Sequence, residues 1–75
     1  MTLIPNLAYT AIIHALERMG WQVSRQKGSH IRLTKFAEGR LRKLTIPAHR
    51  PVKRTTLAKI IKQAGLTVEE FLTLV

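Results

Sequence analysis

The sequence has no cysteine, few aromatic residues and no long apolar run. The absence of cysteine excludes disulfide bonds and thiolate zinc sites, and it fits a reducing compartment, so we expect a cytoplasmic protein. No apolar stretch approaches the roughly 20 residues that a membrane-spanning helix needs. Residues 1–5 lack the basic and apolar regions of a secretory signal peptide, so none is expected, and we expect no membrane partner.

Acidic residues are also scarce. Four of them face 13 Lys and Arg residues, which gives a formal net charge of +9. Every basic residue lies between Arg18 and Lys62, and Glu38 is the only acid in that span. So many positive charges in one span repel each other, and a protein tolerates this repulsion where it binds a polyanion. The charge favours nucleic acid as the partner, with an anionic protein as the second candidate and a solvated basic surface without a role as the alternative.

The length of 75 residues suits one small domain, and we expect residues 1–75 to form it. A modest core leaves little room for a deep cavity, so a site should be shallow and lie on an outer face. The three histidines have no neighbouring carboxylates and no partner at i, i+4, which makes a poor set of metal ligands. We therefore expect no metal and no cofactor.

Apolar residues at helical spacing predict helices near both ends of the chain. The first covers about residues 7–19, with Asn6 as its N-cap. The second begins at a cap on Thr55 or Thr56 and is closed by Gly65. A capping box directly after it predicts a short third helix.

Three alternating stretches between the helices predict an antiparallel meander. They cover residues 21–24, 30–35 and 41–46, with a tight turn at residues 27–28 and a hairpin loop over residues 36–40. The order is then α-β-β-β-α-α. One layer of helices should cover one face of a three-stranded sheet, which is an α+β arrangement.

The alternation assigns the side chains of the second and third strands to two faces. The apolar side chains, which should lie under the helices, are Ile31, Leu33, Leu44 and Ile46. The side chains expected on the open face are His30, Arg32, Thr34, Lys43 and Thr45. His30 should therefore stand on a solvated face with cations beside it.

The stretch from Lys27 to His30 is the strongest candidate site. Imidazole exchanges protons near neutral pH, and a cationic surface attracts a phosphodiester. RNA carries its own nucleophile, the 2′-hydroxyl, so a general base and stabilising cations suffice to cleave it without a metal. His30 is the candidate base, although an exposed structural histidine would have the same position. The candidates for RNA binding or charge stabilisation are Lys27, Gly28, Ser29, Arg32 and Lys43.

Other polar residues allow two interpretations each. His49 is a candidate general acid, or it has a structural role at the end of the third strand. Lys59 and Lys62 on the second helix either contact phosphates or form an ordinary solvated face. His14 is interpreted as a surface residue, and Trp21 as a plug between the first helix and the sheet.

Several of these segments resemble HicA toxins, the mRNA interferases of HicA–HicB toxin–antitoxin systems, and the element order resembles the double-stranded-RNA-binding fold. The matching segments are Gly20-Trp21, residues 25–30, residues 46–49, residues 56–66 and residues 69–71. Thr55 departs from the glycine that the family usually has before its second helix. The resemblance implies a ribonuclease whose strand histidine, here His30, is catalytic. It also implies an antitoxin, HicB, that binds the toxin and blocks its site.

We therefore predict a metal-independent endoribonuclease that cleaves mRNA, with His30 as general base. An acidic HicB-like antitoxin would neutralise it in a hetero-oligomer. The alternative is a non-catalytic module that binds double-stranded RNA. Because aromatic content near the site is low, base stacking is not expected to set specificity.

Overall fold

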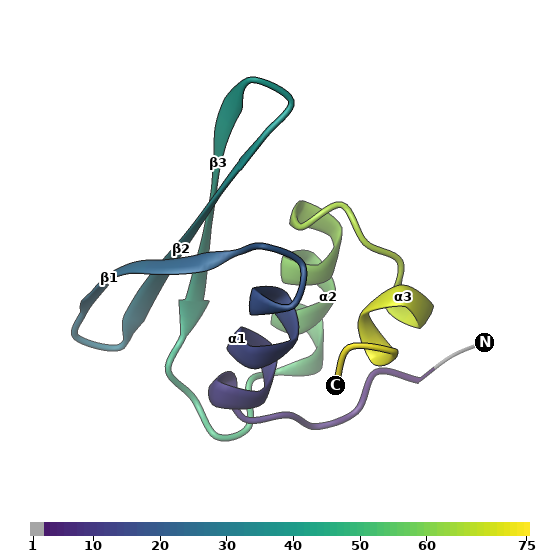
Figure 1. Cartoon of the computed structure of the whole chain (residues 1–75). Helices are drawn as coiled ribbons and strands as arrows, with labels where there is room; N and C mark the ends of the chain where they lie inside the picture. Colours follow the sequence, from purple (N-terminus) through teal and green to yellow (C-terminus); the bar gives the residue numbers. More distant parts are fainter. Residues whose placement is uncertain (1–2) are drawn as a thin grey trace.

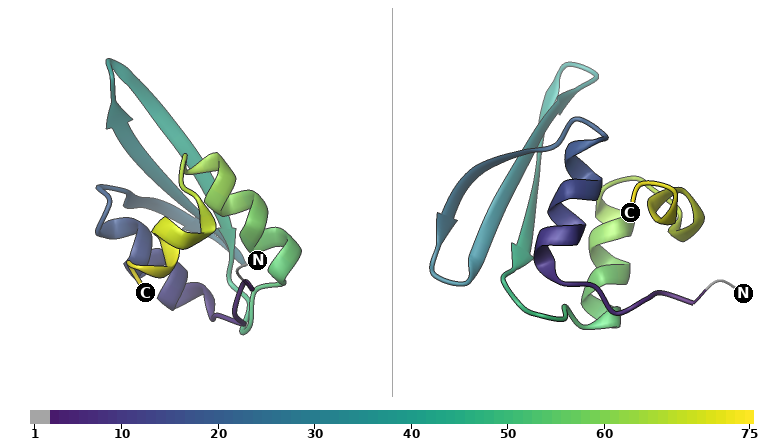
Figure 2. Two further views of the ribbon diagram at one scale, coloured as in Figure 1. Left: turned by 90° about the vertical axis from the view of Figure 1, so that its right-hand side faces the viewer. Right: turned by 60° about the horizontal axis from the view of Figure 1, so that its bottom comes forward.

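Three antiparallel strands and three helices make up the structure, a computed structural model that describes residues 3–75 (Figure 1). The elements in chain order are α1 (Tyr9–Glu17), β1 (Gln22–Lys27), β2 (His30–Ala37), β3 (Arg40–Pro47), α2 (Arg54–Gln63) and α3 (Val68–Leu72). The strands form one sheet in the order β1-β2-β3, and the helices lie on one side of it (Figure 2). The predicted order and the α+β class are confirmed.

The core lies between the sheet and the helices. Its sheet side is made of the four apolar side chains that alternation assigned to this face, all at most 3% exposed: Ile31, Leu33, Leu44 and Ile46. Burying side chains of this size contributes about 1.5–3 kcal/mol each. Trp21 is 2% exposed and belongs to the same core, as predicted. The opposite face of the sheet is left without a covering layer (Figure 2).

The start of α1 differs from the prediction. The helix begins at Tyr9, and its N-cap is Ala8, which makes no side-chain capping bond. Asn6 is therefore not the cap. The cause is a contact far along the chain, because Leu7 forms a bridge with Val52, whose N–H donates to the Leu7 carbonyl at 2.8 Å. This bridge keeps the chain extended up to the first turn of the helix.

The same bridge shapes the start of α2. Val52 is fully buried, and the chain enters the helix directly after it, with Lys53 at the N-cap position and Arg54 as the first helical residue. Lys53 makes no side-chain capping bond, and the predicted caps, Thr55 and Thr56, lie inside the helix. Packing of Val52, rather than a local cap, sets this boundary.

The predicted capping box is present at the start of α3. The Glu70 N–H donates to the Thr67 hydroxyl at 3.1 Å, and the Thr67 N–H donates to the Glu70 carboxylate at 2.9 Å. Two donors at the helix N-terminus are thereby satisfied. Within residues 3–75, none of the helices combines the length and the apolar character that a membrane span requires.

The turn between β1 and β2 lies one residue later than predicted. Lys27 and His30 pair across the ladder, so Gly28 and Ser29 are the two central residues. Gly28 has a φ of +59°, as the first central position of a type II′ turn requires. This turn matches the twist of the strands and fixes the register of the hairpin.

The predicted hairpin loop over residues 36–40 is wrong. Ala37 pairs with Arg40, and only Glu38 and Gly39 lie outside the ladder. Both have positive φ, +53° and +75°, which is the type I′ pattern. Because Glu38-Gly39 supports the tightest hairpin connection, the strands continue to the turn. The hairpin of β2 and β3 therefore projects beyond the helices (Figure 1).

Candidate active site

A β-bulge in β1 determines which side chains share a face with His30. Val23 pairs with Leu33, and the next pair is Arg25 with Arg32, so Ser24 is an extra residue in the strand. The Ser24 hydroxyl donates to the Arg32 carbonyl at 3.2 Å. An extra residue shifts the alternation by one position, so every residue after it changes face.

The bulge brings Arg25 and Lys27 to the open face of the sheet. Lys27 lies directly across from His30, and Arg25 lies across from Arg32. Strict alternation counted forward from Trp21 would have placed both cations on the helix side. β1 runs to Lys27, where the two-residue turn begins, rather than ending at residue 24 as predicted.

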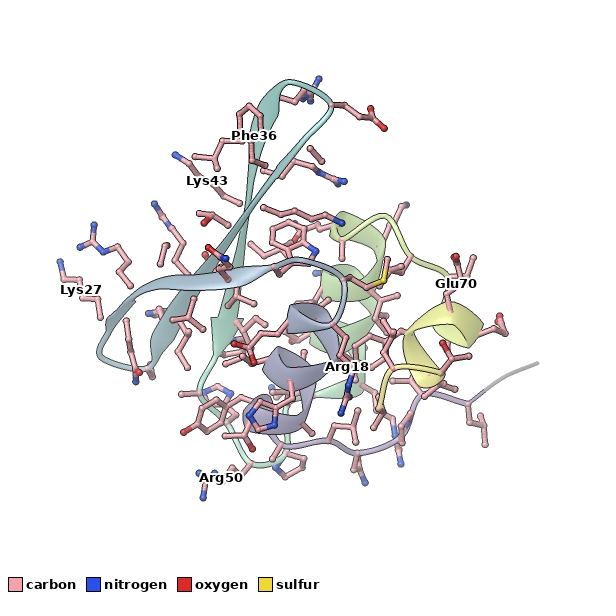
Figure 3. The ribbon with its side chains drawn as sticks, viewed as in Figure 1. Arg18, Lys27, Phe36, Lys43, Arg50 and Glu70 are labelled. Carbon is pink, nitrogen blue, oxygen red and sulfur yellow. The ribbon has the colours of Figure 1, made fainter. Side chains whose placement is uncertain are left out.

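These side chains surround a shallow cavity of about 680 Å³ on the open face. Its lining residues are Arg25, Lys27, Gly28, Ser29, His30, Arg32 and Thr45. Three of them are cations, and no carboxylate lines the cavity in the part of the chain that the structure describes. Figure 3 shows Lys27 at the outer end of the sheet, pointing away from the helices. The cavity is thus a cationic hollow with one imidazole in it.

The backbone of His30 is held from both sides although its side chain is exposed. It is the first residue of the central strand and pairs with Lys27 on β1 and with Pro47 on β3. The carbonyl of Ser29 accepts a hydrogen bond from the Ala48 N–H at 2.7 Å. These contacts fix the backbone position from which the imidazole projects.

The comparison with protein families decides the affiliation. A family model described as HicA toxin of bacterial toxin-antitoxin matches residues 9–66, from the start of α1 to just beyond α2. The chain belongs to the HicA toxin family. The matched range contains every residue that lines the cavity. Comparison with curated proteins and with solved structures gives no match.

Membership in the HicA family implies a toxin–antitoxin system and hence an antitoxin partner. The predicted site residues fall into two groups in this HicA toxin. Those at the β1–β2 turn and on β2 lie together in the cavity, and they are Lys27, Gly28, Ser29, His30 and Arg32. Lys43 and His49 do not line it.

Lys43 lies on the same open face but nearer the tip of the hairpin. It pairs with Thr34 and projects away from the helices (Figure 3). The cavity itself is lined by Thr45, two residues further along β3. Thr45 contributes a hydroxyl to the cavity at the place where the ammonium group of Lys43 was predicted.

His49 belongs to the loop after β3, which is anchored to α1. Its carbonyl accepts a hydrogen bond from the Tyr9 N–H at 3.1 Å. The neighbouring Arg50 guanidinium lies 5.2 Å from the centre of the Tyr9 ring. Such contacts hold the loop against the helix through the backbone of His49 and the side chain of Arg50.

Sequence reasoning missed Arg25 in this HicA toxin. The signal was available in the turn, because a two-residue turn makes Lys27 and His30 cross-strand partners, and partners share a face. Counting back from the turn places Arg25 on that face as well. Within residues 3–75, no group of three or more metal-ligating side chains is close enough to hold a metal ion.

Proposed function

We propose that this HicA-family toxin is an endoribonuclease that cleaves mRNA and that His30 is its general base. The observation that carries the proposal is the position of His30 in a cavity lined by three cations, on the open face of the sheet. An mRNA substrate would place its action in the cytoplasm.

The chemistry uses the nucleophile that RNA supplies. His30 removes the proton of a 2′-hydroxyl, whose oxygen attacks the adjacent phosphorus. The bond from phosphorus to the 5′-oxygen breaks, and that oxygen takes a proton from water. The products are a 2′,3′-cyclic phosphate and a free 5′-hydroxyl. A single general base contributes about 10²–10⁴-fold, so the enzyme should be slow.

The cations have the complementary role. Negative charge grows on the phosphoryl oxygens in the transition state, where Lys27 and the two arginines of the cavity can stabilise it. Arginine is suited to this because its planar guanidinium donates two parallel hydrogen bonds to a phosphate. Lys27 lies across from His30, beside the position where the attacked phosphate would sit.

The pair Arg25–Arg32 supports an anionic ligand independently of the histidine. Two like charges directly opposite each other on one face of a sheet destabilise the pairing. A phosphate between the two guanidinium groups would turn this repulsion into attraction. Such a pair is typical of a binding site whose charge is balanced by its ligand.

The antitoxin partner is proposed to be an acidic, HicB-like protein that forms a hetero-oligomer with the toxin. With a formal net charge of +9, the chain attracts an acidic protein by the same field that attracts RNA. A partner that covers the cationic cavity would block access to His30 and so neutralise the toxin.

A cleavage assay in EDTA tests the proposal. Purified wild-type protein should cut RNA in the presence of the chelator and leave 2′,3′-cyclic phosphate ends, whereas His30→Ala should not cut. His14→Ala is the matched control, because His14 is also exposed but lies on α1, outside the cavity. The assignment of His30 is wrong if His30→Ala cuts as fast as wild type, or if wild type does not cut.

The alternative function is a non-catalytic module for double-stranded RNA. The exposed positions of Lys59 and Lys62 on α2 favour it, because a basic helix can contact phosphates across a groove. Duplex binding that survives His30→Ala, together with no cleavage by wild type, would support this alternative.

A further inference from the structure

Phe36 is the most exposed large apolar side chain of the sheet. It is 73% exposed and lies on β2 opposite Leu41, close to the tip of the hairpin (Figure 3). The ladder between β2 and β3 is unbroken from His30 to Ala37. Phe36 is six residues from His30, an even number, so the two side chains stand on the same face of the sheet.

A polar strip connects the two side chains along this face. On β2 it contains Arg32 and Thr34, and on β3 their cross-strand partners, Thr45 and Lys43. Arg32 and Thr45 already line the cavity around His30. The strip is therefore continuous with the proposed cleavage site, and its charged members are cations.

The length of the strip matches a short piece of RNA. Six residues of a strand at about 3.3 Å each span about 20 Å. A stacked nucleic-acid strand rises about 3.4 Å per nucleotide, so about six stacked nucleotides cover this distance, and fewer do if the strand is extended. Phe36 is thus too far from His30 to contact the nucleotide that is cut.

We propose that Phe36 is a stacking site for an unpaired base, several nucleotides from the bond that is cut at His30. The proposal rests on RNA being the substrate and names the class as single-stranded RNA. A base within a duplex is stacked on both faces by its neighbours, whereas an unpaired base can lie on an exposed aromatic ring. The cations that lead to Phe36 would hold the phosphates of the same strand.

This role departs from the expectation that stacking has no part in specificity. That expectation followed from the low aromatic content near the site. A single aromatic ring is enough to bind an unpaired base when it lies at the end of a basic strip. RNA is the occupant that we infer, because the ring continues a row of cations that begins at the proposed cleavage site, so the strand that is cut there would extend along this row to Phe36.

The proposal is tested by measuring the binding of a labelled oligoadenylate. Its length is about ten nucleotides, within the site sizes of single-strand binders. All variants carry His30→Ala, so that no cleavage occurs. Adding Phe36→Ala should weaken binding by about fivefold or more, because the loss of one base–aromatic stacking contact lowers the affinity by at least this factor. The slope of log affinity against log salt should not change, since no charge is removed. Phe36→Trp should keep the affinity, since it keeps an aromatic ring.

Leu41→Ala is the matched control. It removes a neighbouring exposed apolar side chain, 54% exposed, but no ring. Its effect should stay below about twofold, well under the loss for one stacked base. An equal loss in Leu41→Ala and Phe36→Ala would overturn the proposal, because it would indicate a general apolar surface, as for a protein partner. Unchanged affinity in Phe36→Ala would overturn it as well.

The fluorescence of Phe36→Trp gives a direct signature. Trp21 is the only natural tryptophan and is buried, so the new indole at position 36 should be the one that responds to RNA. The single-stranded oligonucleotide should quench it, and an RNA duplex of the same length should not. Equal quenching by both would contradict the assignment to an unpaired base.

These readouts separate the inference from the proposed function. If wild type fails to cut RNA but stacking at position 36 is observed, the ribonuclease proposal fails and the stacking site stands. If wild type cuts and Phe36→Ala binds and cuts as well as wild type, only the stacking site fails. Because the Phe36 side chain is largely exposed, the variant should fold, and circular dichroism checks this.

Discussion

Lys27 and His30 are direct cross-strand partners, joined by a turn of only two residues. The relationship puts an ammonium group and an imidazole on the same face of a sheet at its open end. Because the turn fixes this pairing, the geometry of the proposed site depends on backbone conformation at Gly28 and Ser29 as much as on the reactive side chains.

Gly28→Ala should lower stability by about 1 kcal/mol, since an L-residue at a φ of +59° is strained. No atom lies within 4 Å of the position of the added Cβ, so the cost comes from the backbone alone. For a domain of this size, a loss of about 1 kcal/mol lowers Tm by about 4–8 °C. Thermal unfolding followed by circular dichroism measures it, with Ser29→Ala as the control for the turn. Equal Tm values for wild type and Gly28→Ala would contradict the strain argument.

Arg25→Ala should stabilise the protein, because it removes the repulsion between Arg25 and Arg32. Like-charged cross-strand pairs cost roughly 0.2–1 kcal/mol, so Tm should rise by a few degrees at low salt. Lys59→Ala removes the same charge from α2 and is the matched control. The difference between the two variants should shrink at about 1 M salt, where charges are screened within a few ångströms. A lower Tm for Arg25→Ala than for Lys59→Ala would show that the pair is not repulsive.

The sequence allowed good prediction of the sheet and of which residues face its core. Alternation in β2 and β3 is strict, so Ile31 and Leu33 could be assigned to the core and His30 to the open face. That assignment was enough to find the candidate histidine. The assignment of faces was correct because burial of one face of the sheet specifies the register of its strands strongly.

Features that depend on distant contacts could not be predicted in the same way. The bulge at Ser24 breaks the alternation of β1, and no local pattern marks which residue is extra. The positions at which α1 and α2 begin, Tyr9 and Arg54, follow from the bridge between Leu7 and Val52, residues far apart in the sequence. Phe36 was assigned to a loop because Glu38-Gly39 indicates a turn but not its length.

A comparison of two double variants should distinguish the sheet face from the helix as the surface that contacts the proposed RNA substrate. Arg25→Ala with Lys27→Ala removes two positive charges from the cavity, and Lys59→Ala with Lys62→Ala removes two from α2. Only the first pair should weaken binding of single-stranded RNA strongly. It should also reduce the salt slope by about 0.7 for each phosphate that the variant no longer neutralises. The opposite result, a strong loss from the α2 pair on duplex RNA, would favour the double-stranded-RNA module.

Arg42→Ala should destabilise the fold without changing RNA binding. Arg42 is on the helix side of β3, where its guanidinium donates to the Gln63 carbonyl at 2.6 Å and lies 5.9 Å from the centre of the Trp21 ring. Removing this hydrogen bond and the cation–π interaction should cost about 1–2 kcal/mol, measured as a lower midpoint in urea unfolding. Arg40→Ala, on the same face of the same strand, is the control for charge and should have a small effect. If Arg42→Ala instead weakened RNA binding while stability stayed the same, the assignment of the two faces of the sheet would be wrong.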